Sequence, residues 1–102
     1  MMYAVISRAK TNELDEVYFK MAKKMRELAL NEYGCVEFTA VTEGSTEIAI
    51  SYWDSMEDIK KWKENSEHSL AQELGCSKWY KEYTVQIVEV VSEYKRGENI
   101  GN

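Results

Sequence analysis

The chain contains one histidine, His68, which lies between two of its three tryptophans, Trp62 and Trp79. An unperturbed imidazole has a pKa of about 6.5, so it can take a proton from a bound molecule at cellular pH. Indole rings can hold a flat aromatic molecule against their faces. The segment 60–80, KKWKENSEHSLAQELGCSKWY, therefore predicts one wall of a pocket for a flat organic compound. The alternative is that His68 is solvated or hydrogen-bonded to a nearby glutamate.

Other aromatic and thioether side chains could complete such a pocket. The candidate substrate-binding residues are Trp62, Tyr52, Trp53, Trp79, Phe38, Met21 and Met25. Tyr52 and Trp53 are neighbours in a predicted strand, so they point to opposite faces and only one of them can line a given cavity. The alternative for Trp62 and the two methionines is ordinary core packing.

Hydrophobic periodicity predicts the elements that would position these side chains. Helix-start residues from Asn12 to Asp15 open a helix that ends at Gly34, and a second helix opens at Ser55, with a break or bend at Asn65–Ser66. The strands are expected at 2–9, 35–42, 47–53 and 83–94, the middle two forming a hairpin. In the last strand the apolar residues change parity, which indicates a bulge or a strand covered on both faces.

This order of elements predicts an α+β fold of the ferredoxin-like, split βαβ type. One antiparallel sheet would carry all the helices on one of its faces. The strands nevertheless have apolar residues on both faces, and a monomer rarely exposes so large an apolar surface. We therefore expect a homodimer in which two copies meet through the uncovered sheet face.

The composition limits the function classes. The 102 residues suffice for one domain, and the net charge of −5 does not favour a nucleic-acid-binding protein. No apolar run is long enough to cross a membrane, and the amino-terminal residues do not resemble a secretory signal, so a cytoplasmic protein is expected. Cys35 and Cys76 lack the spacing of metal ligands, so we expect neither a structural metal site nor a disulfide.

The segment 47–94, EIAISYWDSMEDIKKWKENSEHSLAQELGCSKWYKEYTVQIVEVVSEY, closely resembles the antibiotic biosynthesis monooxygenase family. The shared marks are a strand ending in Trp53, a Ser-capped helix with an interior Trp62, a Trp–Tyr turn and a long final strand. A weaker resemblance extends back to Met1. The resemblance to this family implies a dimeric α+β barrel with a pocket between sheet and helices. We expect residues 1–95 to form the domain and residues 96–102 a polar tail.

The resemblance also implies roles for particular residues. In the polyketide-oxidising branch of the family, a polar side chain one turn before the tryptophan and a proton-active residue six positions after it handle a phenolic substrate; these positions hold Asp58 and His68. Both are thus candidate catalytic residues. The haem-degrading branch uses an asparagine and an axial histidine where this chain has Ser7 and Gln72, so haem degradation is disfavoured.

Three functions remain open from the sequence. The first is a small monooxygenase, without metal or other cofactor, that oxidises a quinol or a polycyclic phenol. Such an enzyme must deprotonate its substrate, hold the resulting anion near O₂ and exclude water. The second is a non-catalytic binding module for a flat hydrophobic metabolite, and the third is a haem-binding protein.

Overall fold

The protein is described by a computed structural model that covers residues 1–72 and 75–97. The elements follow the order β1 (Tyr3–Thr11), α1 (Glu16–Asn31), β2 (Cys35–Glu43), β3 (Thr46–Trp53), α2 (Met56–Gln72), α3 (Gly75–Lys78) and β4 (Tyr80–Glu89). This order confirms the predicted α+β fold of the split βαβ type. The strands form one antiparallel sheet in the order β2-β3-β1-β4.

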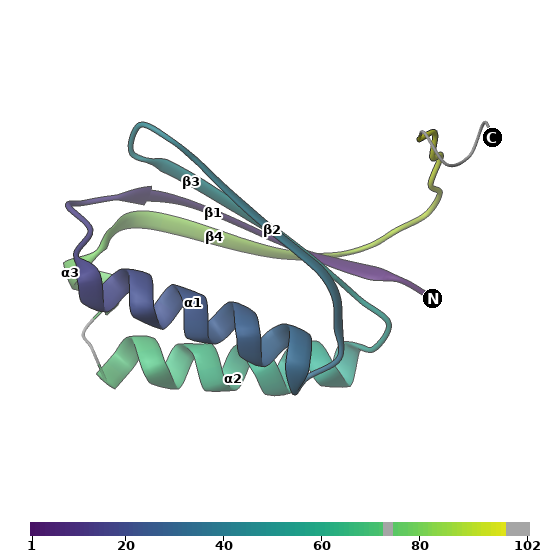
Figure 1. Ribbon diagram of the computed structural model, residues 1–102, viewed down its shortest axis with the longest axis horizontal. Helices are drawn as coiled ribbons and strands as arrows, with labels where there is room; N and C mark the ends of the chain where they lie inside the picture. The colour runs from purple at the N-terminus through teal and green to yellow at the C-terminus, as the bar shows by residue number, and fades with distance from the viewer. Residues whose placement is uncertain (73–74, 98–102) are drawn as a thin grey trace.

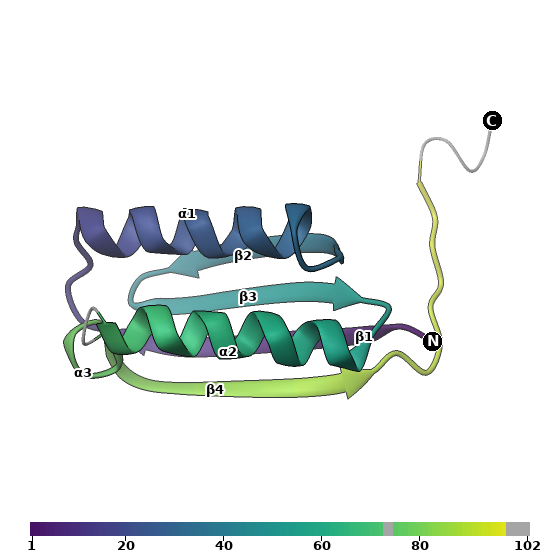
Figure 2. The ribbon, with the colours of Figure 1, turned by 90° about the horizontal axis from the view of Figure 1, so that it is seen from below.

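The two long helices lie on the same side of this sheet (Figure 1). Seen from the helix side, α1 runs along β2 and α2 runs along the middle of the sheet, while β4 is left as an edge strand (Figure 2). We call the face toward the helices the inner face and the opposite one the open face. The open face carries no helix among the described residues.

The first helix begins later than the sequence predicted. Its cap is Asp15, whose Oδ1 accepts a hydrogen bond of 2.9 Å from the backbone N–H of Tyr18. Asn12, the predicted cap, instead donates its backbone N–H to the carbonyl of Trp79 at 2.8 Å. Its side-chain Nδ2 also donates to the carbonyl of Lys78 at 3.4 Å, so Asn12 is bonded to the end of α3 and the residue after it, while Asp15 caps the helix. The helix is followed, as predicted, by Gly34 in the left-handed region, with φ of 84°.

The second helix is continuous from Met56 to Gln72, so of the predicted break or bend at Asn65–Ser66 the break is wrong. Ser66 donates its hydroxyl hydrogen to the carbonyl of Trp62, four residues earlier, at 3.0 Å. This bond satisfies the serine side chain within the helix, so the residue does not interrupt it. The predicted start is confirmed, because the Ser55 hydroxyl accepts the backbone N–H of Asp58 at 3.2 Å.

The sheet contains an irregularity where the sequence did not predict one. In β2 the pairing with β3 shifts between Cys35 and Glu37, which leaves Val36 as an extra residue. The shift brings Cys35 to the same face as Phe38, whereas simple alternation would separate them. The inner face of β2 therefore carries both side chains.

The last strand is shorter than predicted and ends at Glu89 rather than Tyr94. Its register with β1 is regular from Tyr83 to Glu89, so the change of parity in its apolar residues is not a bulge. It arises because Val85 and Ile87 lie on the inner face, whereas Val88 lies on the open face. The strand thus contributes apolar side chains to both faces at different points along its length.

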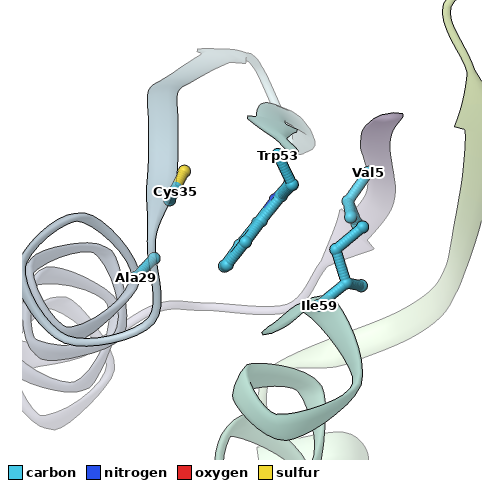
Figure 3. Close-up of a cluster of buried hydrophobic side chains, with 5 residues drawn as sticks. All are labelled: Val5, Ala29, Cys35, Trp53 and Ile59. Carbon is cyan, nitrogen blue, oxygen red and sulfur yellow. The ribbon is translucent and has the colours of Figure 1, made fainter. Parts of the chain in front are cut away.

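The inner face is densely packed at one end. A cluster of buried apolar side chains fills the space between sheet and helices there: Val5, Ala29, Cys35, Trp53 and Ile59 (Figure 3). Trp53 is fully buried, and its indole N–H donates to the hydroxyl of Ser51 at 2.8 Å. Complete burial of a side chain of this size contributes strongly to hydrophobic stability at this end.

Some predictions concern residues that the structure does not describe. Within the expected tail 96–102, residues 98–102 lie outside the described part of the chain, as does Leu74, which was expected to point inward. Nothing can be added about the Cys76 side chain. In the described ranges, no helix is both long enough and apolar enough to span a membrane.

Candidate functional site

A cavity of about 510 Å³ lies between the inner face of the sheet and the helices. Its floor consists of small side chains on three neighbouring strands: Ser7 and Ala9 on β1, Ala40 on β2 and Ala49 on β3. In the sheet register, Ala49 lies directly between Ser7 and Ala40. A row of such short side chains cannot fill the space beneath the helices, and this is why the cavity exists next to the packed end of the sheet.

The walls are aromatic and thioether side chains. Met21 and Met25 come from α1, and Trp62 comes from the middle of α2. The Trp62 indole N–H donates to the backbone carbonyl of Met25 at 2.9 Å, which ties the two helices together and fixes the ring. The Trp62 ring stands edge-on to the ring of Phe38, with 6.0 Å between the centroids. These surfaces suit a flat aromatic ligand.

One end of the cavity is polar. Tyr18 of α1 donates its hydroxyl hydrogen to Oε1 of Glu47, which lies on the inner face of β3. The Tyr18 ring is edge-on to that of Tyr80, at 6.2 Å, and the rings of Tyr80 and Tyr83 lie 5.6 Å apart. All four residues line the cavity, and we call them the polar end. It combines one carboxylate with three phenolic hydroxyls.

Three loop regions are joined behind this polar end. The backbone N–H of Thr11 donates to the carbonyl of Ser45 at 2.8 Å, which links β1 to the β2–β3 hairpin. Lys78 Nζ lies 3.2 Å from Asp15 Oδ2, which links α3 to the start of α1. Trp79 is fully buried and its ring packs edge-on to Tyr18 at 5.3 Å. The buried Trp79 ring therefore packs against the Tyr18 ring and restricts its position.

Burial and hydrogen bonding shift the pKa values of three groups near the site. Burial, and then the hydrogen bond to Glu47, raise the pKa of Tyr18 strongly, so this phenol keeps its proton. Burial also raises the pKa of the Cys35 thiol. The backbone N–H of Tyr18 lowers the pKa of Asp15, with a smaller contribution from Lys78.

Charged side chains surround the cavity away from the polar end. Lys63 forms an ion pair of 2.6 Å with Glu67, both on α2. The Arg26 guanidinium lies 5.4 Å from the centroid of the Phe38 ring and donates to the Phe38 carbonyl at 3.3 Å. Within the part of the chain that the structure describes, no group of three or more His, Cys, Asp or Glu side chains is placed to hold a metal ion.

Four of the seven side chains predicted to bind substrate line the cavity: Trp62, Phe38, Met21 and Met25. The other three are not among its lining residues. Trp53 lies in the packed end of the inner face, where it contacts the Trp62 ring at 5.4 Å. Tyr52 lies on the open face, and Trp79 lies behind Tyr18. The structure thus brings four of the predicted side chains together around the cavity, and places the other three outside its lining.

The structure does not bring either candidate catalytic residue into the cavity lining. His68 is exposed. In an uninterrupted helix, six residues correspond to a rotation of about 240° from Trp62, so His68 points away from the side that Trp62 occupies. Asp58 lies near the α1–β2 loop, where its Oδ2 would be 3.1 Å from a Cβ placed on Gly34. Catalytic roles for these two residues stay predictions that the geometry does not favour.

Sequence reasoning missed Tyr18 and Glu47, the hydrogen-bonded pair of the polar end. Neither was among the candidate site residues; Tyr18 fell within the first predicted helix and Glu47 at the start of the strand predicted at 47–53. The parity of β3 contained a usable signal, because Glu47 shares its face with Ala49, Ser51 and Trp53. A carboxylate in an inward-facing series is unusual and calls for a partner.

The chain is similar in sequence to another protein, YqjZ. No protein-family model matches the chain. The uncharacterized protein YqjZ of Bacillus subtilis is 38% identical over 89 residues, which cover 86% of this chain and 78% of YqjZ. This level of identity over most of both chains places them in one family.

Several solved structures share the fold. SnoaB, a cofactor-independent oxygenase from Streptomyces nogalater, superposes with a TM-score of 0.69 at 8% identity, over 93% of this chain and 98% of SnoaB. Rv0793 of Mycobacterium tuberculosis gives 0.73 at 15% identity, over 93% and 100% of the two chains. A proposed antibiotic biosynthesis monooxygenase from Nitrosomonas europaea gives 0.69 at 18% identity, over 88% and 90%. At these identities the likeness establishes the fold.

Proposed function

Because the chain belongs to the family of Bacillus subtilis YqjZ and has the fold of the antibiotic biosynthesis monooxygenases, we propose that it is a small oxygenase. Its substrate would be a quinol or polycyclic phenol, bound flat in the cavity between sheet and helices. The observation that carries this proposal is the cavity itself, with a floor of small side chains, walls of Trp62, Phe38 and two methionines, and one polar end. SnoaB, which has the same fold, is a cofactor-independent oxygenase.

The proposed reaction requires only the substrate and O₂. The substrate loses one proton, either from a ring CH₂ group next to a phenol or from the hydroxyl of its enol tautomer, and the electron pair left behind is delocalised onto that ring carbon, which attacks O₂. The resulting hydroperoxide loses water and leaves a ketone, so one oxygen atom enters the product and the other leaves as water. The four electrons that reduce O₂ all come from the substrate, and no further reductant is consumed.

The chain's residues would contribute binding, orientation and exclusion of water. Trp62 is fixed by its hydrogen bond to Met25, so its ring holds one preset orientation for stacking. The methionine side chains adapt to the outline of the bound ring system. Enclosure in an apolar cavity protects the anion from protonation by water before O₂ reacts.

Oxygen uptake tests the proposal. With a chelator present, a panel of hydroquinones, naphthoquinols and anthrones should give saturable O₂ consumption well above autoxidation. Ala49→Phe places a ring on the cavity floor and should abolish both binding and uptake. Lys20→Phe adds the same ring on an exposed part of α1 that does not line the cavity, and should leave both unchanged. If no member of the panel is oxidised faster than in buffer, the oxygenase proposal is wrong.

A second candidate function is non-catalytic binding of a flat hydrophobic metabolite. The observation that favours it is that His68 and Asp58, the residues expected to move protons, are absent from the cavity lining. This function predicts saturable quenching of tryptophan fluorescence by the same panel, with no O₂ consumed. Quenching that Ala49→Phe does not weaken would exclude the cavity as the binding site.

We further propose that two copies assemble through the open face. This face carries apolar side chains from every strand: Ile6, Val41, Ile48, Ile50, Tyr52 and Val88. Val41 is 58% exposed and Val88 38% exposed in the single chain, which is costly for so many neighbouring apolar groups. A two-fold axis lets one such face cover its own copy, so no other protein is needed.

The assembly is tested by its mass. Sedimentation at micromolar concentration should give twice the chain mass of 11.9 kDa. Ile50→Glu, in the middle of the open face, should yield a single-chain particle, whereas Lys20→Glu should not. A wild-type particle of one chain mass at all concentrations would refute the dimer.

A further inference from the structure

Glu47 is the one acidic residue at the polar end of the cavity, and its surroundings leave it without a cation. Its cross-strand neighbours on the inner face are Ala9 and Thr42, both uncharged. Among the described residues, no lysine or arginine forms an ion pair with it. Its recorded hydrogen bond is the one that Tyr18 donates to Oε1. A half-buried carboxylate in this state keeps acceptor capacity for a donor that arrives with a ligand.

Tyr18 orients this carboxylate through a hydrogen bond and stays neutral. The tyrosine is 2% exposed and is backed by the fully buried Trp79 ring at 5.3 Å. Its strongly raised pKa means that it stays protonated and donates to Glu47 throughout the working pH range. The carboxylate is therefore held in one orientation, with one hydrogen bond supplied from the helix side.

The floor next to Glu47 leaves room for a ligand. Ala9 lies directly across from it on β1, and Ala49 follows two positions along β3 on the same face. Neither side chain extends beyond its Cβ, so a ring lying on the floor can reach the carboxylate with its edge. Trp62 also lines the cavity and supplies an aromatic surface against which a ring can pack. The arrangement fits a flat molecule with a hydroxyl at one edge.

We propose that Glu47, positioned by Tyr18, accepts the hydrogen of the substrate's phenolic or enolic hydroxyl and is the base of the reaction. This inference rests on the proposed oxygenase function and assigns the proton-accepting role to a residue other than His68 or Asp58. It also narrows the substrate class to flat molecules whose acidic hydroxyl lies at the ring edge.

The proton can be followed through the whole cycle. The substrate hydroxyl gives its proton to the Glu47 carboxylate, and the electron pair of the O–H bond stays on oxygen and spreads to the ring carbon. That carbon forms a bond to O₂, and the peroxide anion takes the proton back from Glu47. Loss of water from the hydroperoxide then gives the ketone, and Glu47 is again a carboxylate. O₂ is the only oxidant required.

Binding without turnover gives the first test. Tryptophan quenching by 2-naphthol and by 2-methoxynaphthalene compares a ring with a hydroxyl to the same ring without that donor. Since the hydrogen bond goes to a charged acceptor, the wild type should bind the naphthol about 10- to 100-fold more tightly. Glu47→Gln keeps the shape and should remove most of this preference, as should Tyr18→Phe to a smaller degree. Glu43→Gln, in the exposed hairpin end, is the control with the same loss of charge.

Turnover gives the second test. With an anthrone that the wild type oxidises, Glu47→Gln should lower kcat by about 100-fold or more and change KM far less, because the base acts in the chemical step. Equal affinity of the wild type for the naphthol and its methyl ether would overturn the assignment, as would wild-type kcat in Glu47→Gln. A strong hydroxyl preference without O₂ uptake would instead refute the oxygenase proposal and leave Glu47 as the hydroxyl acceptor.

Discussion

The contrast between the packed end and the hollow end of the inner face can be tested with two substitutions on one strand. Ala49 and Ser51 lie on the same face of β3, two residues apart, yet Ala49 belongs to the cavity floor and Ser51 is 3% exposed beside Trp53. Ala49→Leu and Ser51→Leu both introduce the same side chain. Equivalent changes at neighbouring positions should therefore have opposite effects on stability.

The expected magnitudes follow from the local packing. Ala49→Leu adds three carbon atoms in open space, worth about 0.8 kcal/mol each when buried, less about 0.5–1 kcal/mol of side-chain entropy. The gain is at most about 2 kcal/mol, or a rise in Tm of about 5–10 °C for a domain of this size. Ser51→Leu overfills a packed region and leaves the Trp53 N–H without its acceptor, at a combined cost of about 2–6 kcal/mol.

Thermal and urea unfolding followed by circular dichroism measure both variants against the wild type. Ser51→Ala serves as an intermediate, because it removes the acceptor of the 2.8 Å hydrogen bond without adding volume. If Ala49→Leu destabilises the protein as much as Ser51→Leu does, there is no open space above Ala49 and the cavity argument fails.

Three further predictions concern the ends of elements and the packed core. Asp15→Asn should lower Tm at pH 7, and the difference should disappear as the pH falls through the Asp15 pKa below 3.8, because a lowered pKa stabilises only the charged form; a difference of equal size at pH 2 would contradict this. Gly34→Ala should cost about 1–3 kcal/mol in chemical denaturation, since φ is 84° and the new Cβ would lie 3.1 Å from Asp58 Oδ2. Gly44→Ala meets nothing within 4 Å and should cost less; a larger loss there would refute the role of the Asp58 contact. The buried Cys35 thiol, with its raised pKa, should react with iodoacetamide far more slowly in the native protein than in urea, and equal rates would show that it is accessible.

Much of the fold could be predicted because its signals are local. The helical spacing of α1, the glycine at its end and the alternation in the β2–β3 hairpin each depend on a few consecutive residues. The hydrogen bond between Asn12 and Trp79, by contrast, joins residues far apart in sequence, and the helix that follows is capped by Asp15 and not by Asn12. The bulge at Val36 likewise depends on the partner strand. Contacts of this kind leave no periodic trace in the sequence.

The candidate site was predicted in part for the same reason. Trp62 and Phe38 could be assigned to the inner surface because each belongs to a clear apolar series. His68 was predicted to share a pocket wall with Trp62 because it lies near it in the sequence, but the continuous helix rotates it away. Tyr18 and Glu47 are neighbours only after α1 has folded over the sheet, so nothing in either local series pairs them.

The small side chains beneath the cavity have a consequence for how the protein can change. Positions 40 and 49 line the cavity and lie outside the buried cluster around Trp53, so the packing of that cluster does not fix the size of their side chains. Descendants of this sequence could therefore enlarge or shrink the chamber by a methyl group at a time and acquire new preferences while still folding. The fold thus places the buried cluster around Trp53 and the variable cavity floor at different positions of the same sheet face.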